Sequence, residues 1–351
     1  MITTHPLLKF FFGESLLDEL LQGCQAQKLP PHFSPIPAAF IKRFRKSFFK
    51  TIRPQRFLAV QVLHGVHVTP EGRIFSGWKI HRCSDLYPLL KPKSALYWLT
   101  SRRRGGDVSH IEEAWFVPLQ IIKRGSYGDY WDEYLTALSF HRPPPGSRIL
   151  LPPHYAAKHA RPDLEALGLE IVDLRDSEVR VGTLHVLPPC QFFDNFLPET
   201  TAAIQAAFPD RVSPVLRQPG RKVYLSRLGF SRPREVTAAA TGRQFDNEDQ
   251  VEDFLRQRGF TIVRTHEASN EEARRALVGA DIVVAAHGAS MFHILWSPPR
   301  ALIELASIEW FLPTFSKFAA ALGISHYDLL DAPAGTVDLK MLALALDKVA
   351  G

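Results

Sequence analysis

The stretch that decides the fold is "ADIVVAAHGASMFHILWSPPRALIEL", residues 280–305. An apolar run ends in His-Gly-Ala-Ser, a second apolar segment follows at once, and a further apolar run closes the stretch on a glutamate. Apolar runs without alternation are typical of strands that are covered on both faces, as in a parallel sheet. The stretch therefore predicts a strand, a helix and a second strand, with Gly288 at the carboxyl end of the first strand.

The same alternation of strand and helix extends through residues 217–351. The segments "KVYLS", "FTIV", "DIVVAA", "ALIEL" and "SHYDL" predict strands, and the segments after them predict helices. Asn247 and the Ser-x-x-Glu box that begins at Ser269 predict two helix starts, and Gly259 predicts a helix end. We expect a parallel sheet wound on both sides.

The preceding residues predict two further regions. Residues 1–55 form an irregular or helical basic preamble, and residues 56–216 an α/β domain whose first part is β-rich, with a turn at residues 70–72 and a strand in "WFVPLQIIK". A helix is expected in "GSYGDYWDEYLTALSF", and "RQPG" at residues 217–220 marks the boundary. The simplest architecture is two α/β halves with a ligand cleft between them, across which the last helix could fold back.

The composition is that of a globular protein. The chain has 351 residues, 46% of them hydrophobic and 22% charged, which suits two domains. The three cysteines lie far apart without metal-binding spacing, so we expect reduced thiols in the cytoplasm. No apolar run reaches the ~18 residues of a membrane span, and the first residues lack the pattern of a signal peptide.

The net charge of +6 is concentrated in "IKRFRKSFFKTIRPQR", residues 41–56, which contains no acidic residue. Interleaved phenylalanines make this stretch compatible with a helix that lies on an anionic membrane surface, which would place the protein peripherally at the inner membrane. A solvated basic face with inward phenylalanines is the alternative. The stretch carries no recognised nucleic-acid motif, so we expect no nucleic-acid partner.

The His-Gly-Ala-Ser turn predicts an anion site, because ligands of open parallel sheets bind at the carboxyl ends of strands. Gly288 would let a ligand approach the backbone, and the N–H groups around Ala289 and Ser290 would meet a pyrophosphate at the positive end of the helix. Ser290 would cap that helix, and His287 would add a donor. The alternative is a tight turn without a ligand. Glu304, near the end of the next strand, is expected to accept the hydroxyls of a ribose or to pair with a basic neighbour.

Four stretches in order resemble a known family. "RKVYLSR" ends in Ser226-Arg227, and "RQFDNE" is similar to an Arg-x-x-x-Asn-Glu element that begins at Arg243. The stretch of residues 280–305 resembles a strand with a His-Gly-Ala turn and a closing Glu-Leu, and "SYGDYWDEYL" resembles Tyr-Gly-His-Trp-x-x-Glu. Together they resemble glycosyltransferase family 61, which includes capsular-polysaccharide biosynthesis proteins. Asp129 departs from the family histidine.

The resemblance implies a GT-B fold, in which two Rossmann-like domains face each other across a cleft. The nucleotide sugar, UDP-linked or related, would bind the C-terminal domain, and a glycan or lipid-linked acceptor the N-terminal one. The implied chemistry is inverting and needs no divalent metal or cofactor. Arg227, Arg234 and Arg243 would then neutralise the leaving diphosphate; surface salt bridges are the alternative role for each.

Two carboxylates are candidates for the catalytic base. Asp129 and Glu133 are four residues apart and share one face of the predicted helix. Their repulsion would raise the pKa of one of them, which suits proton transfer. Alternatively, Asp129 caps the helix and Glu133 pairs locally. The aromatic residues Tyr130 and Trp131 are expected either to stack on a sugar or to join the core.

The sequence thus predicts a metal-independent inverting glycosyltransferase of surface polysaccharide synthesis. A sugar-nucleotide epimerase of the same fold is an alternative. A catalytically degenerate binding protein is another, because Asp129 replaces the histidine.

Overall fold

The computed structural model describes residues 25–27, 51–53, 60–70, 72–76, 79–81, 108–117, 130–152, 155–174, 178–187, 198–229, 245–308, 311 and 314–350. Most of these residues divide into two compact units, one between residues 53 and 192 and the other from residue 193 onward. Two short strands, β1 (Gln25–Gln27) and β2 (Thr51–Arg53), form a separate two-stranded sheet. Thr51–Arg53 is therefore extended and does not continue a helix through residues 41–56.

The C-terminal unit contains a five-stranded sheet in the order β11-β10-β12-β13-β14, in which all neighbours are parallel. Its strands are β10 (Lys222–Ser226), β11 (Phe260–Arg264), β12 (Ile282–Ala286), β13 (Ala301–Ala306) and β14 (His326–Asp331). All five predicted strands and their parallel arrangement are confirmed. The chain adds β11 on one side of β10 and then β12 on the other, so the winding direction reverses between β10 and β12.

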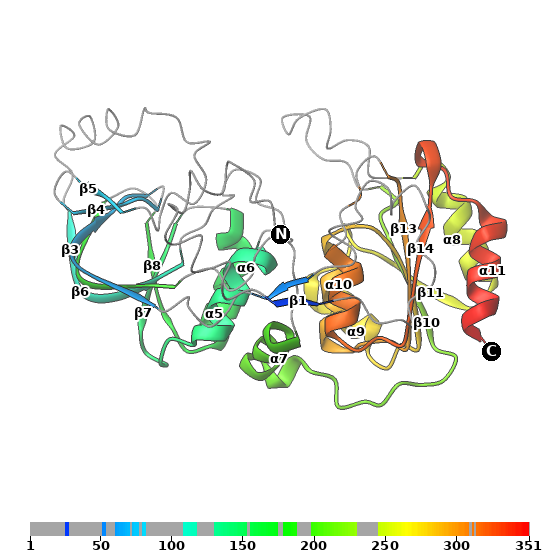
Figure 1. The fold of residues 1–351 in the computed structure, drawn as a ribbon, viewed down its shortest axis with the longest axis horizontal. Coiled ribbons are helices and arrows are strands. Elements are labelled where there is room, and N and C mark those ends of the chain that lie inside the picture. Colours follow the sequence, from blue (N-terminus) through cyan, green and yellow to red (C-terminus); the bar gives the residue numbers. More distant parts are fainter. Residues whose placement is uncertain are drawn as a thin grey trace. The chain divides into compact units, whose positions relative to one another are not determined.

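Helices cover both faces of this sheet, with α8 and α11 on one side and α9 and α10 on the other (Figure 1). Their bounds are α8 (Glu248–Gln257), α9 (Asn270–Leu277), α10 (Thr314–Ala321) and α11 (Leu339–Ala350). Alternate strand residues such as Tyr224, Val284 and Ile303 pack with Leu255 of α8 and Leu346 of α11 in one buried cluster. The last helix therefore packs against the sheet of its own unit.

The C-terminal unit begins before the boundary predicted at residue 217. Helix α7 (Pro198–Ala207) belongs to this unit, followed by the short helix η4 (Pro209–Arg211). Gln205 donates to the carbonyl of Leu295 at 2.8 Å, and the N–H of Ser213 donates to the carbonyl of Trp296 at 2.8 Å. These contacts attach the segment to η6 (Ala289–Trp296), a 3₁₀ helix.

The N-terminal unit contains a seven-stranded mixed sheet in the order β5-β4-β3-β9-β6-β7-β8. The strands are β3 (Gln61–Val68), β4 (Ile74–Ser76), β5 (Lys79–Ile80), β6 (Ser109–Phe116), β7 (Arg148–Leu151), β8 (Glu170–Asp173) and β9 (Val179–Val186). The pairs β9-β6, β6-β7 and β7-β8 are parallel, whereas β3 is antiparallel to β4 and β9. This half is therefore not purely parallel, and the β-rich first part of the predicted domain is the antiparallel side of its sheet.

Three helices lie among the described residues of this unit. They are η3 (Tyr130–Leu135), whose turns are of π type, α5 (Thr136–His141) and α6 (Tyr155–Ala166). The helix expected in "GSYGDYWDEYLTALSF" is confirmed for its described part. The strand expected in "WFVPLQIIK" ends at Phe116 and starts earlier than predicted, because Ser109–Phe116 pairs with β9; residues 118–123 lie outside the described residues.

Gly182 in β9 is required by the close approach of the neighbouring strand. A Cβ atom at this position would lie 2.7 Å from the carbonyl oxygen of Glu112 in β6. Real Cβ contacts do not reach this distance, and a backbone oxygen inside a sheet cannot move away cheaply.

We expect Gly182→Ala to lower the free energy of unfolding by about 1–3 kcal/mol, as overpacking does in well-packed interiors. Thermal and urea denaturation would measure the loss. Glu112→Ala, which removes an exposed side chain but keeps the carbonyl, is the control and should stay within ~0.5 kcal/mol of the wild type. Equal stability of the Gly182→Ala variant and the wild type would contradict the packing argument.

Candidate functional site

The candidate site lies where the winding of the C-terminal sheet reverses, at the carboxyl ends of β10 and β12. Open α/β sheets bind ligands at this switch point, because the loops that leave the two strands diverge there. Arg227 directly follows β10, and His287 directly follows β12. The Nη1 atom of Arg227 donates a hydrogen bond of 2.8 Å to the carbonyl oxygen of His287. Two residues predicted from separate motifs are thereby brought together across the switch point.

Gly288 makes room for this arginine. A Cβ atom at residue 288 would overlap Nη1 of Arg227. The backbone of Gly288 is extended, with φ 160° and ψ 173°, so the position does not need glycine for its backbone conformation. The absent side chain was predicted to admit a ligand to the backbone; in the structure the guanidinium of Arg227 occupies that space.

The helix after the turn is η6, and its start differs from the prediction. Gly288 is the N-cap residue and no side chain caps the helix, so the predicted capping by Ser290 is wrong because Ser290 lies inside η6. The N–H of Met291 donates to the carbonyl of Gly288 at 3.0 Å. The first N–H groups of a helix have no intrahelical partner, so the half-buried Ala289 and Ser290 carry the amides that suit an anion.

His287 is held by a buried carboxylate. Its Nδ1 contacts Oε1 of Glu304, and its ring lies 5.3 Å from the ring of Phe311 and 5.3 Å from that of Phe315. The side chains of His287 and Glu304 are 3% and 0% exposed. The hydroxyl of Tyr327 lies 2.5 Å from the other oxygen of Glu304. This contact fixes the orientation of the His287 ring through Nδ1.

Tyr327 is the donor in its contact with Glu304. Burial and the neighbouring Glu304 raise the pKa of Tyr327 well above its ordinary value, so its hydroxyl keeps the proton and donates it to Glu304. Glu304 is therefore the acceptor in this hydrogen bond. Its oxygens are engaged within the protein and fully buried, which matches pairing with a basic neighbour rather than the predicted binding of a ribose.

A second buried carboxylate, Glu248, fixes the turn that carries Arg227. Its Oε1 accepts the backbone N–H of Arg227 at 3.0 Å and the hydroxyl of Tyr224 at 2.5 Å, and lies 3.1 Å from the hydroxyl of Ser226. Burial and then Glu248 raise the pKa of Tyr224 well above its ordinary value, so Tyr224 donates. The sequence analysis placed Glu248 in the Arg-x-x-x-Asn-Glu element but gave it no role in the site. The Asn-Glu pair of that element is the feature of the sequence that could have indicated such a role.

Asn247 occupies the predicted N-cap position of α8, but its side chain has another partner. Its Nδ2 donates to the carbonyl of Val337, and its Oδ1 accepts the N–H of the same residue, both at 2.9 Å. No side-chain cap bond is formed at this helix start. The predicted capping box at Ser269 is confirmed, because its hydroxyl accepts the N–H of Glu272 and Glu272 contacts the N–H of Ser269 in return.

Glu252 connects the end of β10 to β11. Its oxygens accept Nε of Arg264 at 3.0 Å and Nη2 at 2.9 Å, and the hydroxyl of Ser226 lies 2.8 Å from Oε1. Burial raises the pKa of this carboxyl, but the hydrogen bonds from Arg264 and Ser226 outweigh it, so the pKa is lowered. Glu252 is therefore an ionised, nearly buried support for Ser226.

Several predicted site residues lie outside the described residues. These are Asp129, Arg234 and Arg243, together with the side chain of Glu133, whose backbone belongs to η3. Tyr130 and Trp131 are each 1% exposed and belong to the core, so they do not form a stacking platform. The hydroxyl of Tyr130 contacts Asp163 of α6.

Two searches of the described part of the chain gave negative results. No group of three or more His, Cys, Asp or Glu residues is placed to hold a metal ion there. Among the helices of that part, none is long and apolar enough to cross a bilayer.

Comparison with protein families supplies one match. The sequence model of the family described as Glycosyltransferase 61 matches residues 16–303, which is most of the chain and includes the Ser226-Arg227 and His287-Gly288 pairs. Comparison with curated proteins finds no match.

We expect the support of Ser226 by Glu252 to make stability depend on pH. The folded pKa of Glu252 lies below its unfolded value, so its contribution is complete above about pH 4.3 and is lost as the pH falls through the folded pKa. Glu252→Gln should lower the free energy of unfolding by roughly 1–3 kcal/mol at pH 7. As the pH falls, the free energy of unfolding of this variant should decrease less steeply than that of the wild type.

Urea denaturation at intervals between pH 7 and pH 3 would measure both effects. Glu165→Gln, which changes an exposed carboxylate of α6, is the control and should follow the wild type. Parallel pH profiles for the wild type and Glu252→Gln would show that Glu252 makes no such contribution.

Proposed function

The chain belongs to glycosyltransferase family 61 and is a glycosyltransferase, and from this membership we propose that it binds the diphosphate of a nucleotide sugar at the switch point between β10 and β12. The hydrogen bond from Arg227 to the His287 carbonyl is the observation that supports the proposal, because it places a guanidinium beside the start of η6. Guanidinium and helix-start amides are both suited to phosphate oxygens.

The site supplies positive charge where a leaving nucleotide gains negative charge. Arg227 is only 7% exposed, and both its backbone and its guanidinium are already held, so little reorganisation accompanies ligand binding. Fixed donors in a poorly solvated site stabilise developing charge more than mobile donors in water. We therefore propose that Arg227, His287 and the amides of Ala289 and Ser290 stabilise the departing diphosphate without a divalent metal.

Glu304 acts on this chemistry through His287. Glu304 contacts the imidazole at Nδ1 and so fixes the orientation of the ring that precedes η6. We assign Glu304 and Tyr327 as positioning residues for His287. Arg234 and Arg243 remain proposed additional ligands of the diphosphate.

The proposed reaction is an inverting single displacement. A carboxylate, Asp129 or Glu133, takes the proton of an acceptor hydroxyl, whose oxygen attacks the anomeric carbon of the sugar. The bond between that carbon and the diphosphate oxygen breaks on the opposite face, and the electron pair leaves with the nucleotide. A GT-B arrangement of the two units would bring the N-terminal base to the donor, and the acceptor is proposed to be a glycan or glycolipid of surface polysaccharide synthesis.

The proposed setting is the cytoplasmic side of a membrane. Residues 41–56 supply a cationic stretch for an anionic surface near a lipid-linked acceptor. Most of that stretch lies outside the described residues.

We expect UDP, as the first nucleotide in a panel, to raise the melting temperature of the wild type. A ligand concentration of about 100 times the dissociation constant stabilises the folded state by about 2.7 kcal/mol. His287→Ala and Arg227→Ala should abolish the shift, and Arg227→Lys should retain only part of it because the fork of donors is lost. The measurement is a thermal-shift titration with UDP, GDP, CMP and their sugars.

The matched controls are His326→Ala and Arg275→Ala, which alter exposed residues of the same unit. Both should respond to nucleotide as the wild type does. If no nucleotide or nucleotide sugar moves the melting temperature of the wild type, the proposed donor site is wrong.

We expect one of Asp129→Asn and Glu133→Gln to reduce transfer by at least ~100-fold while leaving the nucleotide-induced thermal shift intact, because a base acts on the acceptor and not on donor binding. The assay measures UDP released with and without an acceptor. Release only with acceptor supports transfer, whereas interconversion of the donor sugar without acceptor would indicate an epimerase. Unchanged turnover in both variants would exclude both carboxylates as the base.

A further inference from the structure

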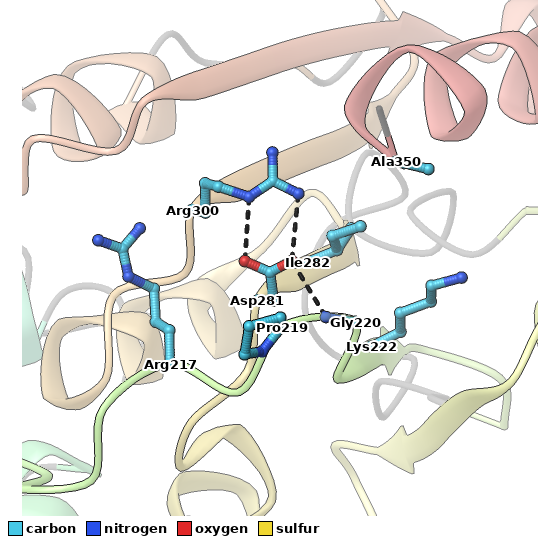
Figure 2. Close-up of a pocket in the computed structure, with 8 residues that line it drawn as sticks. All are labelled: Arg217, Pro219, Gly220, Lys222, Asp281, Ile282, Arg300 and Ala350. Atoms are coloured by element: carbon cyan, nitrogen blue, oxygen red, sulfur yellow. Dashed lines mark hydrogen bonds and ion pairs between the residues drawn. The ribbon is translucent and has the colours of Figure 1, made fainter.

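A cavity of about 510 Å³ lies at the amino ends of the strands of the C-terminal sheet, and the candidate donor site lies at their carboxyl ends. It is lined by Arg217, Pro219, Gly220, Lys222, Asp281, Ile282, Arg300 and Ala350 (Figure 2). Lys222 begins β10, Ile282 begins β12, and Arg300 directly precedes β13, so the cavity lies at the amino ends of three adjacent strands. Arg227 and His287 follow the carboxyl ends of two of the same strands.

Asp281 is the single acid among the described residues that line the cavity, and Arg300 neutralises it. Arg300 donates to Asp281 through Nε at 3.0 Å and Nη2 at 3.1 Å, and the N–H of Gly220 lies 3.4 Å from Oδ2 (Figure 2). Arg300 also donates to the carbonyl of Val349 at 2.7 Å, which fixes the end of α11 as one wall. The Asp281–Arg300 pair therefore has no net charge and serves as a rigid floor.

Two further cations line the cavity on either side of this pair. Arg217 is exposed, and within the described part of the chain no hydrogen bond or ion pair of its guanidinium is formed. The ammonium of Lys222 has one long hydrogen bond, 3.4 Å to the carbonyl of Arg258, and lies 5.8 Å from the centre of the Phe260 ring. Figure 2 shows the two side chains on opposite sides of the Asp281–Arg300 pair. Among the described residues, the cavity thus has a surplus of two positive charges whose donors are mostly unused.

We propose that this cavity binds a phosphate monoester. A dianion matches the two surplus charges, and phosphate oxygens accept hydrogen bonds from guanidinium and ammonium groups alike. The volume lies within the range of small-ligand sites, about 300–1,000 Å³. None of the eight lining residues is aromatic, so the cavity offers no surface for stacking a nucleobase. A small or lipid phosphomonoester therefore fits this site better than a nucleotide.

Calorimetric titration of the full chain with glycerol 3-phosphate, at an ionic strength fixed with chloride, tests the proposal. We expect saturable binding, with the dissociation constant raised roughly three- to tenfold by Arg217→Ala and by Lys222→Ala, since each removes one exposed charge-assisted contact. Lys340→Ala removes an exposed positive charge from α11 outside the cavity and should leave the constant unchanged. His287→Ala should also leave it unchanged, which separates this site from the proposed donor site.

Two results would overturn the proposal. One is the absence of binding beyond the effect of chloride. The other is equal weakening by Arg217→Ala and Lys340→Ala, which would show attraction to overall charge only. Sedimentation with phosphatidic acid vesicles, against phosphatidylcholine vesicles, identifies the source of the phosphate. Pelleting that Arg217→Ala reduces indicates a lipid headgroup, and glycerol 3-phosphate binding without such pelleting indicates a soluble ligand.

Discussion

The hydrogen bond between the Arg227 guanidinium and the His287 carbonyl joins the ends of two strands whose following chains run in opposite directions around the sheet. Two features of the candidate site follow from it. It requires glycine at position 288, because a Cβ atom there would overlap the guanidinium. It also places one cation beside the start of η6, whose amides belong to the other strand. The bond adds a side-chain link to the pairing of β10 with β12, just beyond the last paired residues Leu225 and Ala285.

Two buried carboxylates hold the two sides of that bond. Burial of polar oxygens is costly unless hydrogen bonds replace their water, and both residues meet this condition. Glu248 accepts from Tyr224 and the Arg227 backbone, and Glu304 from Tyr327 and His287. Each carboxylate thus has a tyrosine donor and one donor from the site itself. This pairing fixes the positions of Arg227 and His287 before any ligand arrives, which suits electrostatic catalysis.

The sequence predicted the C-terminal fold well, because its strands are short apolar runs separated by helices with local stop signals. The strand order was beyond reach, since it depends on which strands pair and not on any one segment. The predicted caps show the same limit. Ser269 caps its helix through a partner three residues away, whereas Asn247 is bound by Val337, 90 residues along the chain. For Glu304 the sequence indicated a site but not its partner, because Tyr327 and His287 meet it only in the folded sheet. The boundary near residue 193 was missed since α7 is attached by contacts to η6.

The cavity at the amino ends of the strands and the candidate donor site at their carboxyl ends have little direct electrostatic interaction. β10 spans five residues, from Lys222 at the cavity to Ser226 beside Arg227. At ~3.3 Å per residue the strand is about 16 Å long. The exposed cations of the cavity are screened beyond about 8 Å at physiological ionic strength. A charge change at Arg217 or Lys222 therefore has little direct effect on Arg227, and any influence of a ligand in the cavity on the donor site must be carried by displacement of the strands. Since β10 and β12 are buried and paired on both sides, such displacement is strongly resisted, and the two sites are expected to bind their ligands independently.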